Sequence, residues 1–236
     1  MKEIKETDMT MQQEPIQENK MGVLPIRPLL LGMAWPAILS MTISALYNIV
    51  DSIFVAKLSE DALTAVSIVS PIQMLIIALS VGSGVGINSL IARRLGAHRQ
   101  EEADQAASTG LRIGVFNYLV FLLIGVCFTG IFVSGYAEKG GYIYQQAVIY
   151  MQIVCIGSFF LNMQVVFEKI LQSTGNMIAP MICSLTGAVI NIILDPILIF
   201  GLLGAPRLEV AGAAIATITG QLFGMLVGAF IIFKGE

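Results

Sequence analysis

Six long apolar runs follow one another along this chain of 236 residues. Each is at least about 20 residues long, the length that a helix needs to cross the hydrocarbon core of a bilayer. The runs are Leu29–Ala56, Ala62–Ala92, Ala107–Val133, Gln146–Phe167, Ile178–Leu203 and Val210–Phe233. They are continuous rather than alternating, which is typical of helices and not of a transmembrane barrel. The sequence therefore predicts an all-α integral membrane protein with six transmembrane helices.

The composition argues against a soluble globular domain. Hydrophobic residues make up 56% of the chain and charged residues 12%, whereas an average soluble domain has roughly 25% charged residues. The net charge of −3 is small and there is no basic stripe, so we expect no nucleic-acid partner. His98 is the single histidine, which makes a histidine-based metal site or catalytic triad unexpected.

The placement of charge predicts the topology. Residues 1–24 are polar and charged, and we expect a disordered cytoplasmic tail there, followed by the transmembrane lobe over residues 25–236. With the N-terminus inside, only Lys57, Lys139 and Arg207 of the 13 lysines and arginines lie outside. Because basic residues favour the cytoplasmic side, the sequence predicts that both termini are cytoplasmic.

Two of the predicted inner connections carry charges of both signs. Arg93–Ala106 is expected to be either a solvated loop or a short amphipathic helix on the inner surface. Glu168–Met177 follows the fourth apolar run, so Glu168 and Lys169 are expected outside the spans.

Two aspartates interrupt the apolar runs. Asp51 lies in the first run and Asp195 in the fifth, and a carboxylate costs about 2.5–3.5 kcal/mol near the middle of a span. An acid inside a membrane is a candidate functional residue by default. Both runs cross in the same direction and both aspartates lie in the outer half, so the two carboxyls could share one cavity. For Asp51 the alternative is a helix-end carboxylate at the interface, because Lys57 follows about 9 Å further along the helix.

Neutral polar residues accompany both aspartates. Asn48 precedes Asp51 by three residues, and Asn191 precedes Asp195 by four. These spacings place each asparagine on the same helix face as its aspartate. Each face therefore combines a carboxylate with an amide oxygen.

Prolines and a threonine add to the second of these groups. Pro196 follows Asp195 and has no N–H, so it is expected to kink the helix and to free the carbonyl of Ile192. Pro36 is expected to kink the first helix in the same way. Thr217, in the sixth run, could add a hydroxyl. Because hard cations bind several oxygen ligands, these residue types indicate a cation site.

Short motifs spread along the chain resemble one known family. They are Pro36–Ser40 (PAILS), Leu46–Asp51 (LYNIVD), Gly86–Gly96 (GINSLIARRLG), Leu171–Asn176 (LQSTGN), Asn191–Pro196 (NIILDP) and Gly212–Thr217 (GAAIAT). In this order and spacing, the motifs are similar to the N-terminal six-helix lobe of the multidrug and toxic compound extrusion (MATE) family of cation-coupled efflux transporters. The resemblance covers the chain from about Pro25 to its end.

The resemblance implies secondary active export of organic, often cationic, compounds by antiport against Na⁺ or H⁺. The ligands that it implies for the coupling ion are Asp51, Asp195, Asn191 and Thr217. The weaker cavity-lining candidates are Tyr47, Asn48 and Asn162. We expect no other cofactor and no enzymatic activity, and a multi-pass location in the plasma membrane, in a prokaryote.

The chain departs from the family pattern in length. The family has two six-helix lobes with the export cleft between them, whereas the sequence holds one. Three interpretations follow: the chain is part of a longer protein, it pairs with a second half-size chain, or it associates with itself.

Other functions fit parts of the same pattern. A lipid-linked sugar flippase of the same superfamily is one, although such flippases line their cavity with basic residues. A truncated fragment that does not transport is another. An intramembrane hydrolase with Asp51 and Asp195 as an acid–base dyad meets the minimum requirement of two carboxyls, but the asparagines suit ion binding better.

Overall fold

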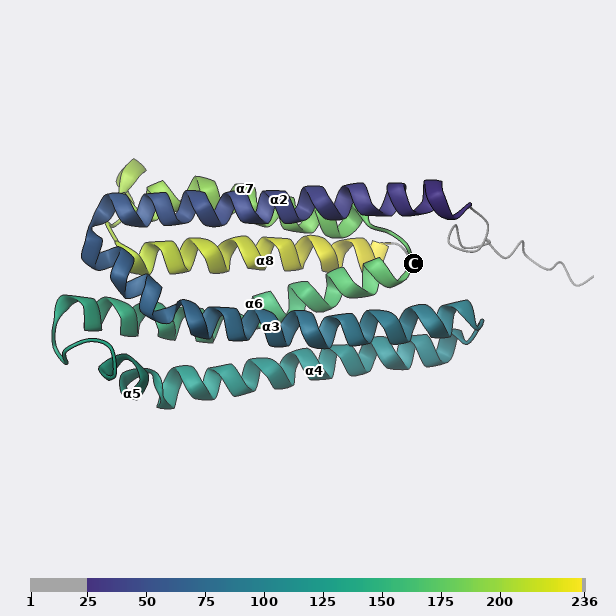
Figure 1. The fold of residues 1–236 in the computed structure, drawn as a ribbon, viewed down its shortest axis with the longest axis horizontal. Helices are drawn as coiled ribbons and strands as arrows, with labels where there is room; N and C mark the ends of the chain where they lie inside the picture. The colour runs from purple at the N-terminus through teal and green to yellow at the C-terminus, as the bar shows by residue number, and fades with distance from the viewer. Residues whose placement is uncertain (1–24, 235–236) are drawn as a thin grey trace, which may run out of the picture.

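The computed structural model describes residues 25–234, which form long helices joined by short turns (Figure 1). The helices are α2 (Ile26–Leu58), α3 (Glu60–Gly96), α4 (Gln100–Cys127), α5 (Thr129–Ser134), α6 (Tyr142–Ser173), α7 (Ile178–Phe200), the 3₁₀ helix η1 (Leu202–Gly204) and α8 (Val210–Lys234). Six of them are long and apolar enough to span a membrane. The predicted all-α fold with six spans is confirmed. The predicted N-terminal tail, residues 1–24, lies outside the described residues.

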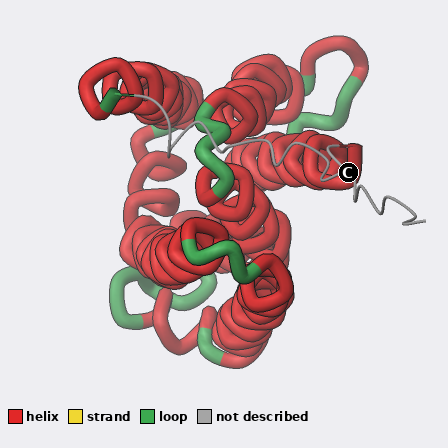
Figure 2. Tube along the Cα trace, turned by 90° about the vertical axis from the view of Figure 1, so that its right-hand side faces the viewer, coloured by secondary structure: helices red, strands yellow, loops and turns green. Residues whose placement is uncertain are grey.

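The six long helices form one bundle, seen from the side in Figure 1 and along its length in Figure 2. α6 lies at the centre and packs against α3, α4 and α8, while α7 packs against α8 and α2. α2 lies at the edge, and of its residues only Pro36 and Val55 are buried. The helix that carries Asp51 is therefore also the one least enclosed by the others.

The two ends of the bundle are distinguished by their turns. The Lys57 end holds the junction of α2 and α3 together with η1, and the Arg93 end holds the turn from α3 to α4 and that from α6 to α7 (Figure 1). In the topology predicted from the lysines and arginines, the Lys57 end is the outer one.

The prediction that the connection to the next helix begins at Glu168 is wrong. α6 continues to Ser173, so Glu168 and Lys169 belong to the helix. Hydropathy marks the stretch of a helix that lipid surrounds, whereas helical hydrogen bonds continue through polar residues that face other helices. The fourth apolar run therefore ends before its helix does.

The segment Arg93–Ala106 is neither a loop nor a separate surface helix. α3 extends to Gly96 and α4 starts at Gln100, so the polar residues lie at the ends of two spanning helices. An ion pair between Arg94 Nη1 and Glu102 Oε2, 2.7 Å apart, joins the two helix ends. The third apolar run is also divided, at Phe128 between α4 and α5.

Glycines set the distance between α7 and α8. A Cβ atom added to Gly220 would lie 2.5 Å from the carbonyl oxygen of Gly187. No side chain fits at that separation, so the two backbones touch directly, as small residues allow in membrane bundles. This contact brings Thr217, one turn before Gly220, beside Asn191 of α7.

Candidate cation-binding site

Asp51 and Asp195, the acid pair, lie between α2 and α7. Asp195 is completely buried, and Asp51 is half-buried on the side of α2 that meets α7. The two carboxyls are close enough to interact electrostatically. Ionised carboxylates only accept hydrogen bonds, so a proton or a cation between the two would remove their mutual repulsion.

Asn191 and Thr217 complete the group. The amide nitrogen of Asn191 donates to Asp195 Oδ1 and to Thr217 Oγ1, each at 3.3 Å. The first contact follows from their spacing of one helical turn on α7, and the second from the close approach of α7 and α8. The structure therefore brings together all four residues named as ion ligands from the sequence.

Three oxygen atoms of this group have no hydrogen-bond partner among the described residues. They are Asp51 Oδ1, Asn191 Oδ1 and Asp195 Oδ2, and all three are buried. Buried polar atoms are nearly always hydrogen-bonded. All three atoms are acceptors, so only a donated hydrogen or a cation can satisfy them. A bound Na⁺ or H⁺ supplies what these oxygens need, so the residues fit the ion that the sequence indicated.

Tyr47 also lies near the acid pair. It precedes Asp51 by one helical turn and is close enough to Asp51, Asp195 and Glu168 to interact with them electrostatically. Its side chain points toward the N-terminus of its helix, as side chains in helices do. Tyr47 therefore lies between the acid pair and the Arg93 end.

Tyr150 and Gln73 are neighbours of the site that the sequence analysis missed. Tyr150 of α6 is buried, and its hydroxyl accepts a hydrogen bond of 3.1 Å from Gln73 Nε2 of α3. The hydroxyl is close enough to both carboxyls to interact electrostatically. Gln73 could have been noticed from the sequence, since it is an amide in the middle of an uncharged run.

Two of the weaker candidates do not reach the acid pair. Asn162 is buried between α3 and α6, where its Oδ1 accepts from Ser80 Oγ and its Nδ2 donates to the carbonyl of Ser158, each at 2.8 Å. The contact with Ser80 joins α3 to α6, and the contact with Ser158 lies within α6. Asn48 is exposed, and its amide donates to the carbonyl of Ser44 at 2.8 Å.

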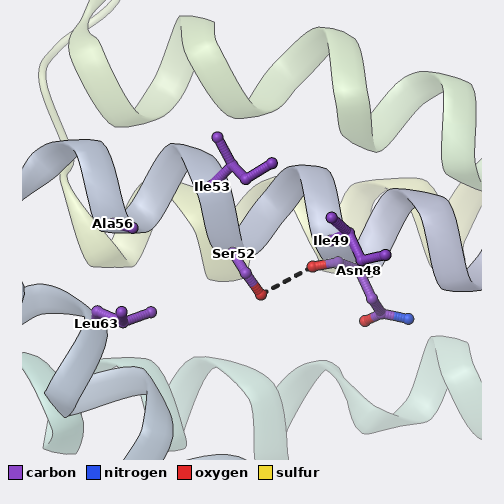
Figure 3. A pocket seen from close by; sticks show the side chains of 6 residues that line it. All are labelled: Asn48, Ile49, Ser52, Ile53, Ala56 and Leu63. Atoms are coloured by element: carbon purple, nitrogen blue, oxygen red, sulfur yellow. Dashed lines mark hydrogen bonds between the residues drawn. The ribbon is translucent and has the colours of Figure 1, made fainter.

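Asn48 instead lines a groove on the exposed side of α2, next to α3. The groove has a volume of about 450 Å³ and is lined by Asn48, Ile49, Ser52, Ile53, Ala56 and Leu63 (Figure 3). Ser52 Oγ donates to the carbonyl of Asn48 at 2.9 Å, the dashed line in the figure.

The predicted kink residues lie inside their helices. Pro36 is in α2 and Pro196 is in α7, and each helix continues on both sides of its proline. A bend at either position stays a prediction.

Comparison with known proteins gives a consistent result. The family model described as MatE matches residues 36–197. A protein named FAD transporter from Shewanella oneidensis is 29% identical over 222 residues, which cover 91% of this chain and 48% of the relative. The probable multidrug resistance protein NorM from Thermotoga maritima is 25% identical over 92% of this chain and 47% of the relative.

A solved structure shows the same arrangement of helices. The crystal structure of a MATE mutant superposes with a TM-score of 0.85 and 29% sequence identity, over 94% of this chain and 49% of the other. The chain thus spans about half the length of the relatives that it matches. Its six apolar helices and its bacterial relatives identify a multi-pass protein of the plasma membrane.

Proposed function

Because this chain belongs to the MatE family, we propose that it forms one half of a transporter that exports organic compounds in exchange for Na⁺ or H⁺. Asp51 and Asp195 bind the coupling ion, with Asn191 and Thr217 as neutral ligands. The observation that supports this most strongly is the set of three buried acceptor oxygens without a donor. No other group of described residues leaves several acceptors unsatisfied at one place.

The position of α2 suggests how ion binding acts on the lobe. Asp51 is on this peripheral helix and Asp195 is on α7, which is held tightly by α8. With the site free of a cation, the two carboxylates repel each other, and a bound ion removes this repulsion. The ion therefore favours arrangements in which α2 lies against α7, and its release favours others, which is a shift between two populations.

The groove beside Asn48 is the proposed contact of this half with the exported compound. Its six lining residues are uncharged, which suits an amphipathic organic molecule better than a lipid-linked sugar phosphate held by basic residues. A second half, from a longer chain or from another half-size chain, forms the opposite wall.

The names of the relatives bear on the alternatives. One relative is named a FAD transporter, so flavin nucleotides belong among the substrates to be tested. Several others are named multidrug export or resistance proteins. These names describe transport, export or drug resistance, which argues against an intramembrane hydrolase that uses the acid pair.

Transport in vesicles tests the proposal. The chain is reconstituted alone and together with a C-terminal half from a relative, and efflux of a fluorescent organic cation is followed after a Na⁺ or a proton gradient is imposed. We expect gradient-driven efflux with both halves present, and its loss in Asp195→Asn. Efflux that is the same with and without either gradient would contradict cation coupling.

A further inference from the structure

A second acidic group lies inside the bundle, away from the acid pair. Glu168 of α6 is half-buried, and its Oε1 accepts two hydrogen bonds. One comes from Gln164 Nε2 at 2.9 Å, and the other from Ser184 Oγ of α7 at 3.1 Å. We call Glu168, Gln164 and Ser184 the Glu168 site.

The packing of α8 holds this site in place. A Cβ atom on Gly224 would lie 2.8 Å from the side-chain amide of Gln164. Any residue larger than glycine would displace that amide, which donates to Glu168. Three helices, α6, α7 and α8, therefore fix the surroundings of the Glu168 carboxyl.

Glu168 has no ionic partner among the described residues. The ion pairs within residues 25–234 join Arg94 and Arg99 to Glu102, and Arg207 to Glu209. Lys169, the next residue on α6, instead donates from Nζ to Gln172 Oε1 at 2.9 Å.

Lys169 is close enough to Glu168 to interact with it electrostatically, although the two form no ion pair. The other titratable groups near Glu168 are Tyr47 of α2 and Cys183 of α7, both uncharged in their protonated forms. α8 places Gly224 against Gln164 and Gly228 against Phe167, both on this part of α6. A carboxylate held inside the bundle without an ion pair is unfavourable, and protonation removes its charge.

We propose that Glu168 is a proton-binding site of the lobe, separate from the acid pair. The neighbouring groups select a proton rather than a metal ion. Gln164 and Ser184 both direct hydrogens at Oε1, whereas hard cations need several oxygen ligands turned toward them. A proton needs only one free lone pair of the carboxylate.

The position of the site gives it a role in proton movement. Ser184 and Asp195 are eleven residues apart on α7, which places the Glu168 site about 16 Å from the acid pair toward the Arg93 end. Tyr47 lies between the two and interacts electrostatically with both. In the topology predicted from the lysines and arginines, Glu168 therefore exchanges protons with the inner side, and the acid pair with the outer side.

Infrared difference spectroscopy on the full chain in lipid nanodiscs tests the proposal. Isotope-labelled glutamate shifts the carbonyl band of protonated glutamic acid away from that of aspartic acid. We expect a glutamic-acid band that appears and disappears with pH, is lost in Glu168→Gln and persists in Glu138→Gln, a matched change of an exposed glutamate. A wild-type chain without such a band, or a band that Glu168→Gln leaves unchanged, would overturn the proposal.

Two further variants keep the test independent of folding and of the proposed function. Ser184→Ala removes one donor to Glu168, so the frequency of the band should change, and an unchanged frequency would count against the assignment. The double variant Asp51→Asn with Asp195→Asn should retain the band. If cation binding at the acid pair fails while the band persists, the antiport proposal fails and the Glu168 proposal stands.

Discussion

The two acidic sites of the bundle differ in what surrounds the carboxyl oxygens. At the acid pair, three buried acceptor oxygens have no donor. At the Glu168 site, two donors from two helices converge on one oxygen. The first arrangement needs a positive charge from outside the protein. The second supplies the carboxyl with hydrogen bonds from the protein itself. Acidic residues in one lobe can thus differ in the ligand that they suit, because their neighbours differ.

The sites also differ in how firmly their helices are held. Glu168, Gln164 and Ser184 belong to α6 and α7, which α8 packs against. Asp51 belongs to α2, whose residues are mostly exposed. A site that joins a fixed helix to a peripheral one can convert ion binding into movement, and a site within the fixed helices cannot do so to the same extent.

The largest expected effect is the loss of Na⁺ binding in Asp195→Asn. This change keeps the shape of the side chain and removes a charge at the centre of the acceptor group, so affinity should fall by roughly a hundredfold or more. Calorimetry on the purified chain measures it. Asp104→Asn, a change of an exposed aspartate near the Arg93 end, serves as the control and should bind Na⁺ as the wild type does.

Gly224→Leu should destabilise the packing around the Glu168 site. The new side chain would collide with the amide of Gln164, and overpacking of this kind typically costs about 1–3 kcal/mol. We expect a clear drop in the yield of folded protein and in its thermal stability. Leu226→Ala, on the same helix and 48% exposed, should have little effect. Equal yields for both variants would mean that α8 does not pack as described.

Thr217→Val should weaken the cation site without disrupting it. The hydroxyl accepts from Asn191, and its loss should cost about 1 kcal/mol, a several-fold decrease in Na⁺ affinity. Thr219→Val is a matched control, since that hydroxyl bonds only to the carbonyl of Ile215 in its own helix. If both variants bind Na⁺ equally well, Thr217 is not a ligand.

The smallest expected effect on ion binding is that of Ser184→Ala. It removes a donor from Glu168 but lies about 16 Å from the acid pair, so Na⁺ affinity should stay within about twofold of the wild type. Thr186→Ala, whose hydroxyl bonds to the carbonyl of Ile182 in its own helix, is the control. A large loss of Na⁺ affinity in Ser184→Ala alone would show that the two sites are not separate.

The sequence predicts the number of spans well because an apolar run of bilayer length has few other folds. It predicts the ends of the helices poorly, as α6 illustrates. The run stops at Phe167, but the helix continues, and Glu168 faces α7 rather than lipid. Hydropathy alone does not record which face of a helix meets a neighbour.

The acid pair was predictable for a different reason. Asp51 and Asp195 stand out as isolated charges in two runs that cross in the same direction, and their depths are similar. Nothing in the periodicity of either run identifies the helix that packs against it. The same limit explains why Tyr150 and Gln73, from α6 and α3, were missed, and why Asn162 was a candidate although it bonds to Ser80 instead.

Competition between Na⁺ and protons at the acid pair tests the account most directly. Na⁺ binding to the purified wild-type chain is measured by calorimetry over a range of pH, beside Asp195→Asn and Glu168→Gln. Because a proton on either aspartate removes a negative ligand, Na⁺ affinity should fall as the pH is lowered, and Na⁺ binding should release protons. Glu168→Gln should keep this behaviour, and Asp195→Asn should lose it. Na⁺ binding that persists in Asp195→Asn, or that does not depend on pH in the wild type, would contradict the account.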